Sequence, residues 1–131
     1  MDLNTALRIM YGCAILGAGI VGLVTLFAPS LAARYVFLGA TNVDIYIRIL
    51  GALWLSLGAV SILGLISPIR FIPILVVQLV YKSLWLLVAA YPALLAGSRE
   101  VGLIFFAGLF SAWVFALLLM IPFTLVFPTG P

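Results

Sequence analysis

The chain has 131 residues, of which 67% are hydrophobic and 7% are charged, and its formal net charge is +3. Because a soluble domain carries about 25% charged residues, this composition excludes an ordinary water-soluble protein. Six cations against three acids leave no basic surface for a nucleic acid. The sequence has no histidine and one cysteine, so no catalytic residue and no metal site are predicted.

Four apolar segments follow one another along the chain, at about 5–27, 43–66, 71–95 and 101–127. At 1.5 Å per residue, each helix would be at least as long as the ~30 Å hydrocarbon core of a bilayer. The short connections leave no room for a soluble domain and make consecutive helices antiparallel neighbours. We therefore predict an all-α fold, a single transmembrane four-helix bundle that covers residues 1–131.

The first two spans carry small residues at helical spacing, which would let the helix backbones approach closely. Two interpretations are open: packing within the bundle, or a face for a second copy or another subunit. The residues concerned are Gly12, Ala14, Ala18, Gly19, Gly22, Gly51, Ser56 and Gly58.

The connection between the first two spans is not a simple polar loop. Pro29 cannot continue the first helix without breaking a backbone hydrogen bond. The residues after it alternate between apolar and polar at nearly helical spacing, with Arg34 and Tyr35 suited to the headgroup region. This pattern predicts a short interfacial helix.

Two charged residues stand at the start of the second span. Asp44 and Arg48 are four residues apart, so they share a helix face and are predicted to form an ion pair. In the alternative interpretation, Arg48 binds an anionic headgroup or a substrate carboxylate, and Trp54 lines a pocket next to it.

The third span contains the most informative residue, Lys82. With Gln78, Tyr81 and Trp85 it gathers on one side of the helix, about 16 Å into the span. A lysine at the bilayer centre costs about 2.5 to 3.5 kcal/mol, which indicates that something polar shelters it. Three interpretations compete: hydrogen bonds that join helices, a pocket for a lipid-like or quinone-like ligand, or a carboxylate from another subunit.

Two prolines, Pro92 and Pro122, lie near the ends of the third and fourth spans. Each removes a backbone hydrogen bond, so kinks are expected there.

A family resemblance adds to this interpretation. The stretch RILGALWLSLG at residues 48–58 resembles the second-helix pattern of DoxX-like small four-helix membrane proteins, as do LFAP at 26–29 and ARY at 33–35. The resemblance implies a bacterial inner-membrane protein, and it supports a quinone or lipid ligand because some members are linked to quinone-dependent sulfur oxidation. The residues 78–85 have no counterpart in that pattern, so no site residue is carried over.

The sequence thus favours a non-catalytic inner-membrane protein that binds a lipid- or quinone-like ligand, or that serves as an accessory subunit of a larger membrane complex. The alternatives are a membrane subunit of a quinone-linked oxidoreductase and an oligomeric transporter or channel. The expected partners are membrane lipids and other membrane subunits or further copies of the chain. No cofactor is evident beyond a quinone or lipid.

Overall fold

The computed structural model of the chain describes residues 1–38, 45–127 and 130. Within this part, four helices are long and apolar enough to cross a membrane: Leu3–Phe27, Ile47–Ile66, Ile72–Leu95 and Val101–Met120. The prediction of an all-α four-helix fold is confirmed. In chain order the elements are α1 (Leu3–Ala14), η1 (Ile15–Gly19), α2 (Ile20–Phe27), α3 (Pro29–Leu31), η2 (Ala32–Val36), α4 (Ile45–Ile66), α5 (Ile72–Trp85), η3 (Leu86–Ala90), α6 (Tyr91–Leu95), α7 (Val101–Met120) and α8 (Phe123–Val126).

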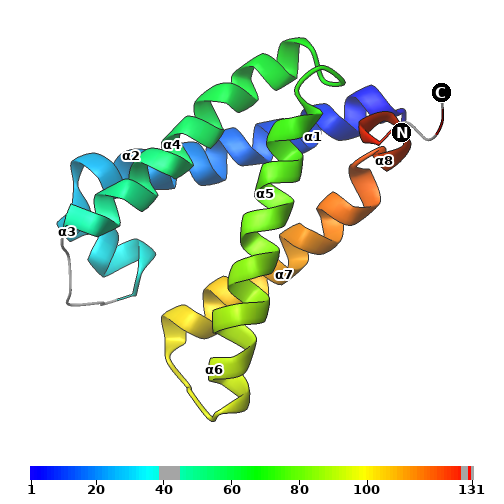
Figure 1. The fold of residues 1–131 in the computed structure, drawn as a ribbon. Coiled ribbons are helices and arrows are strands. Elements are labelled where there is room, and N and C mark those ends of the chain that lie inside the picture. The colour runs from blue at the N-terminus through cyan, green and yellow to red at the C-terminus, as the bar shows by residue number, and fades with distance from the viewer. Residues whose placement is uncertain (39–44, 128–129, 131) are drawn as a thin grey trace.

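The four spans form two antiparallel hairpins (Figure 1). In the first, the continuous helix α1–η1–α2 packs along α4; in the second, α5–η3–α6 packs against α7. The hairpins meet at the end that carries the N-terminus, the α4–α5 turn and α8, and they diverge toward the end that carries α3 and α6. The short connections account for this antiparallel pairing.

The main hydrophobic core lies where the hairpins meet. It comprises Leu7, Met10, Tyr11, Ile72, Leu75, Leu117 and Ile121. The buried Tyr11 hydroxyl donates a hydrogen bond of 2.8 Å to the carbonyl of Pro68, which fixes the α4–α5 turn against α1. This core joins the hairpins at one end, and toward the other end a groove lies between them, bridged by the stacked rings of Trp54 and Phe106.

The first hairpin is held by an unusually close approach of α2 and η1 to α4. A Cβ atom built on Gly22 would lie 2.3 Å from the backbone nitrogen of Leu55, and one built on Gly58 would lie 2.4 Å from Cα of Gly19. Gly51 is equally confined by the backbone of α2. The structure therefore agrees with packing within the bundle, the first of the two interpretations, for four of the small residues: Gly19, Gly22, Gly51 and Gly58.

Two residues predicted for this packing lie outside it. Nothing lies within 4 Å of a Cβ built on Gly12, and Ser56 is exposed and donates only to the carbonyl of Ala52 in its own helix. The prediction placed Gly12 and Gly19 on one face because they are seven residues apart. The π-helix η1 follows Gly12 and ends at Gly19, and its wider turn rotates Gly12 off that face.

Proline and glycine set the ends of the spans in the second hairpin. The α7 helix ends at Met120 rather than near residue 127, because Ile121 before Pro122 adopts an extended backbone and α8 then starts a new turn. Pro92 is accommodated by the π-helix η3 just before it. Gly97 has φ of 97°, and its N–H donates to Leu94 in a helix-ending motif.

The part of the connection after α2 that the structure describes is mainly helical, as predicted, and contains α3 and η2. At the other end of the chain, Asp2 caps α1 by accepting from the Thr5 backbone N–H at 3.0 Å. Hydrogen bonds from Thr5 lower the pKa of Asp2.

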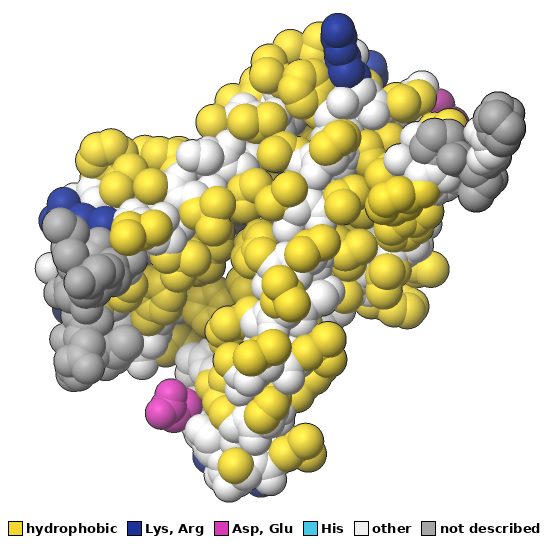
Figure 2. All heavy atoms as spheres, viewed as in Figure 1, with side chains coloured by type: hydrophobic (Ala, Val, Ile, Leu, Met, Phe, Trp, Pro, Cys, Tyr) yellow, Lys and Arg dark blue, Asp and Glu magenta, His cyan; other side chains and the backbone are white. Residues whose placement is uncertain are grey.

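The outer surface of the helices is apolar, and the charged side chains lie near the ends of the hairpins (Figure 2). Large apolar side chains point outward along the spans, among them Ile66, Val88 and Leu95. Such a surface fits an integral membrane protein, in which lipid takes the place of water.

Candidate functional site

The groove between the hairpins contains two adjoining cavities. The inner one has a volume of about 220 Å³ and is walled on one side by small residues of α1, η1 and α2. The other has a volume of about 400 Å³ and extends to Glu100 in the turn between α6 and α7. The two cavities adjoin each other, because both are lined by Trp54, Tyr81, Phe106 and Phe110. Figure 2 shows the groove as a hollow with apolar walls.

A hydrogen-bonded cluster from α5 and α7 lies in the inner cavity. Lys82 Nζ donates to the Tyr81 hydroxyl at 2.7 Å and to Gln78 Oε1 at 3.3 Å. Trp113 Nε1 of α7 donates to the same Gln78 oxygen at 3.1 Å. Helical spacing explains the convergence, since residues three and four apart share one face of α5. The cluster thus ties α5 to α7 through Gln78 and leaves Lys82 facing the groove.

Lys82 is almost completely buried, with 5% of its surface exposed, and aromatic rings surround its ammonium group. Nζ lies 4.3 Å from the ring centroid of Tyr81, 5.2 Å from that of Phe110 and 5.9 Å from that of Trp113. The negative faces of such rings attract a cation. Across residues 1–38 and 45–127, no carboxylate pairs with this ammonium group; its hydrogen-bond acceptors are the neutral oxygens of Gln78 and Tyr81.

One polar atom of the cluster has no partner. Gln78 is 1% exposed, and its amide nitrogen Nε2 makes no hydrogen bond. Two donors converge on Gln78 Oε1, which fixes the orientation of the amide and leaves its NH₂ group as the unpaired end. A buried donor without a partner costs about 1 to 3 kcal/mol, so an acceptor from outside the chain would be stabilised here.

Aromatic rings form the rest of the groove. Trp54 of α4 stacks on Phe37 and on Phe106 of α7, with ring centroids 6.1 Å and 6.3 Å apart. Farther along, Trp85 meets Phe110 edge to face at 5.4 Å. These rings connect the two hairpins across the groove and offer flat apolar surfaces to a ligand.

The structure brings together most of the residues that the sequence pointed to. Gln78, Tyr81 and Lys82 form the cluster, and Trp54 and Trp85 line the groove. Ala14 and Ala18, predicted to pack between helices, line the inner cavity, where their small size leaves space.

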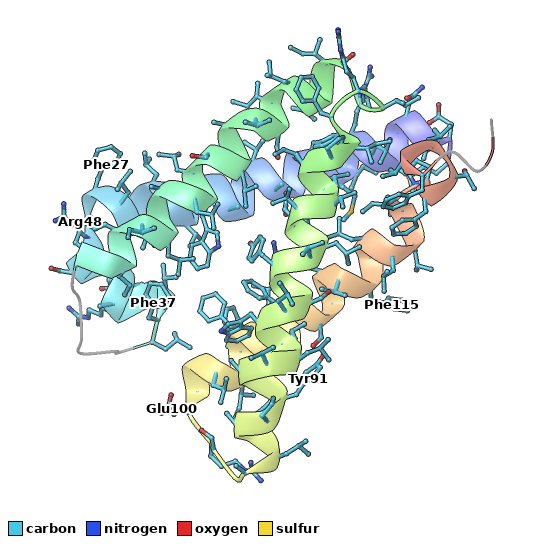
Figure 3. The ribbon with its side chains drawn as sticks, viewed as in Figure 1. Phe27, Phe37, Arg48, Tyr91, Glu100 and Phe115 are labelled. Carbon is cyan, nitrogen blue, oxygen red and sulfur yellow. The ribbon has the colours of Figure 1, made fainter. Side chains whose placement is uncertain are left out.

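The prediction that Arg48 belongs to the pocket is wrong. Its side chain is exposed and lines neither cavity, and Figure 3 shows it at the outer edge of the first hairpin. Arg48 and Trp54 are six residues apart, which puts them on different faces of α4. The predicted partner Asp44 lies outside the described residues, so the ion pair stays a prediction.

Sequence reasoning missed four aromatic residues of the groove: Phe37, Phe106, Phe110 and Trp113. A signal for three of them was present, because Phe106, Phe110 and Trp113 stand at offsets of four and seven, on one face of the fourth span. Phe37 carries no such signal, since its position depends on the fold of the connection after α2.

Comparison of the chain with protein-family models, with curated proteins and with solved structures finds no match. The resemblance to DoxX-like proteins therefore stays a prediction, and the functional argument depends on the geometry of the groove.

Proposed function

We propose that this protein is a small non-catalytic membrane protein that binds a lipid- or quinone-like hydrophobic ligand in the groove between its two hairpins. The observation that carries the proposal is the buried, unpaired Gln78 Nε2 beside Lys82 in an otherwise apolar cavity. A ligand with a hydrogen-bond acceptor would satisfy these donors, and its apolar part would pack on the aromatic walls. We also propose the bacterial inner membrane as its location, which rests on the DoxX-like resemblance alone.

The groove has the features of a ligand site rather than of a packing fault. The polar groups of its inner cavity are few and centre on Gln78, Tyr81 and Lys82 of α5, while the remaining walls are mainly aromatic, aliphatic or small. Pockets for small molecules commonly combine an apolar lining with a few placed polar groups. The groove also lies between spans, so an apolar ligand could reach it from the bilayer.

The direct test is extraction of the protein in mild detergent, followed by mass spectrometry of the lipids, quinones and proteins that remain bound. Gly17 offers a way to fill the inner cavity: it lines that cavity, and nothing lies within 4 Å of a Cβ built on it. The Gly17→Leu variant should lose most of the bound ligand. Gly108→Leu is the matched control, because Gly108 also has open space around it but lines neither cavity.

The same experiment separates the alternatives. Wild-type protein that carries no apolar ligand, or a Gly17→Leu variant that retains as much as the wild type, would contradict the proposal. A protein that co-purifies in a fixed ratio would support an accessory-subunit role or a quinone-linked oxidoreductase complex instead, and a stable homo-oligomer without ligand would favour a transporter or channel.

A further inference from the structure

Going one step beyond the proposed function, on which this step rests, we infer that the ligand is an anion: a long-chain carboxylate whose head group pairs with Lys82 and Gln78. The two side chains come from one face of α5 and line the same cavity. Neutral quinones, alcohols and esters would be poorer ligands than the carboxylate.

The charge around Lys82 supports this inference. The rings of Tyr81, Phe110 and Trp113 stabilise a cation at Nζ, but they do not neutralise it. Its two acceptors are neutral oxygens, and the described part of the chain brings no carboxylate to it. A buried charge without a counter-ion is strongly unfavourable, so a ligand that supplies a negative charge gains more here than one that supplies only an acceptor.

The number of free donors also matches a carboxylate. Two of the three N–H groups of Lys82 are directed to Tyr81 and Gln78, which leaves one. The NH₂ group of Gln78 has two more, both unused. Every unused group is a donor, and a carboxylate has two oxygens with about four lone-pair sites and no proton to donate. An alcohol could match only part of this set.

The depth of the cluster favours a carboxylate over a phosphate head group. Lys82 lies about 16 Å along its span, far from the headgroup region in which a phosphodiester remains hydrated. The inner cavity of about 220 Å³ is small, and the groove continues past Trp54 and Phe106 along an aromatic wall that suits a single apolar chain.

The test compares the binding of four probes to the detergent-purified protein by quenching of tryptophan fluorescence: hexadecanoic acid, hexadecanol, methyl hexadecanoate and a short-chain quinone. Hydrogen bonds to charged groups exceed neutral ones by about 1 to 1.5 kcal/mol, so the acid should bind roughly tenfold more tightly than the alcohol or ester. A fifth probe, hexadecyl phosphate, distinguishes the carboxylate from other anions and should bind more weakly than the acid.

Variants locate the effect on the two side chains. Lys82→Met should reduce the affinity for the acid to that for the alcohol and leave the alcohol unchanged, whereas Lys82→Arg should keep the preference for the acid. Gln78→Glu should abolish that preference, because the new carboxylate, four residues before Lys82 on the same helix face, would form an ion pair with the ammonium group in place of the ligand. Arg70→Met is the control and should behave as the wild type, because it removes an exposed cation that lies in the turn between α4 and α5 and lines neither cavity.

The outcomes distinguish this inference from the proposed function. If the quinone or the alcohol binds as tightly as the acid, or if Lys82→Met keeps its preference for the acid, the carboxylate assignment is wrong and the ligand site stands. If hexadecyl phosphate binds more tightly than the acid, the ligand is an anion of another class. If no probe binds and the protein carries no ligand on purification, the proposed function itself fails.

Discussion

The close approach of α2 and α4 gives the sharpest prediction, the effect of Gly22→Ala. The added methyl group would lie 2.3 Å from the backbone nitrogen of Leu55 and 2.8 Å from the carbonyl oxygen of Gly51, against an ordinary contact distance of 3.4–4 Å. Both neighbours are backbone atoms, so no side-chain rotation can relieve the clash and the helices must separate by about 1 Å to restore normal contact.

The magnitude follows from two opposing terms. Overpacking of this kind costs about 1 to 3 kcal/mol, and a rigid backbone neighbour puts Gly22→Ala at the upper end. Alanine gains up to about 1 kcal/mol over glycine in helix propensity, so the net destabilisation should be about 2 kcal/mol. The control Gly12→Ala meets nothing within 4 Å and should gain only the propensity term, about 0.5 to 1 kcal/mol of stability.

The measurement is the free energy of unfolding in mixed micelles, titrated with dodecyl sulfate and followed by circular dichroism. Gly58→Ala, whose methyl group would lie 2.4 Å from Cα of Gly19, should behave like Gly22→Ala. Equal stabilities of the Gly22→Ala and Gly12→Ala proteins would refute the argument, because the contact between α2 and α4 would then not be as close as the structure has it.

Three further predictions concern single side chains, each measured by the same unfolding titration. Lys82→Met should raise the stability of the ligand-free protein by about 1 kcal/mol. The substitution removes a burial cost of about 2.5 to 3.5 kcal/mol and loses two hydrogen bonds of about 1 kcal/mol each. A marked loss of stability would instead favour the interpretation in which Lys82 links helices. Tyr11→Phe should destabilise by about 1 to 3 kcal/mol, since the buried carbonyl of Pro68 loses its donor, and an unchanged stability would show that water replaces the hydroxyl. Ser56→Ala should change stability by less than about 0.5 kcal/mol, because this exposed side chain bonds only to its own helix; a larger effect would indicate that Ser56 contacts another molecule.

The elements of the fold were largely predictable, and the exceptions have identifiable causes. Long apolar segments can satisfy their backbone groups in a bilayer only as helices, so the four spans follow from hydrophobicity alone. The fourth span was predicted to end near residue 127, whereas α7 ends at Met120. The prediction was wrong because the residues after Pro122 are still apolar, and hydrophobicity alone does not show whether the helix continues through the proline. The helix face of Gly12 was predicted wrongly because the π-helix η1 has no clear signal in the sequence.

The site was predictable in part. Gln78, Tyr81 and Lys82 stand on one helix at fixed spacing, so local geometry was sufficient to bring them together. Trp113 comes from another helix, and its contact with Gln78 joins residues 35 positions apart. Local spacing cannot give such a contact, which depends on how the two helices of the second hairpin pack.

The sequence by itself determined that the protein has four apolar helices and that one of them carries a lysine deep in its span, because hydrophobicity and helical period are local properties. The tertiary structure decided that the two hairpins join at one end and diverge at the other, which leaves a groove beside that lysine. The cause is the distribution of large and small side chains: Tyr11, Leu75 and Leu117 fill the junction, while the small side chains of Ala14 and Ala18 leave room for the inner cavity. Whether large and small side chains fill a junction or leave a groove depends on which residues of neighbouring helices face one another, and this is decided only when the helices pack.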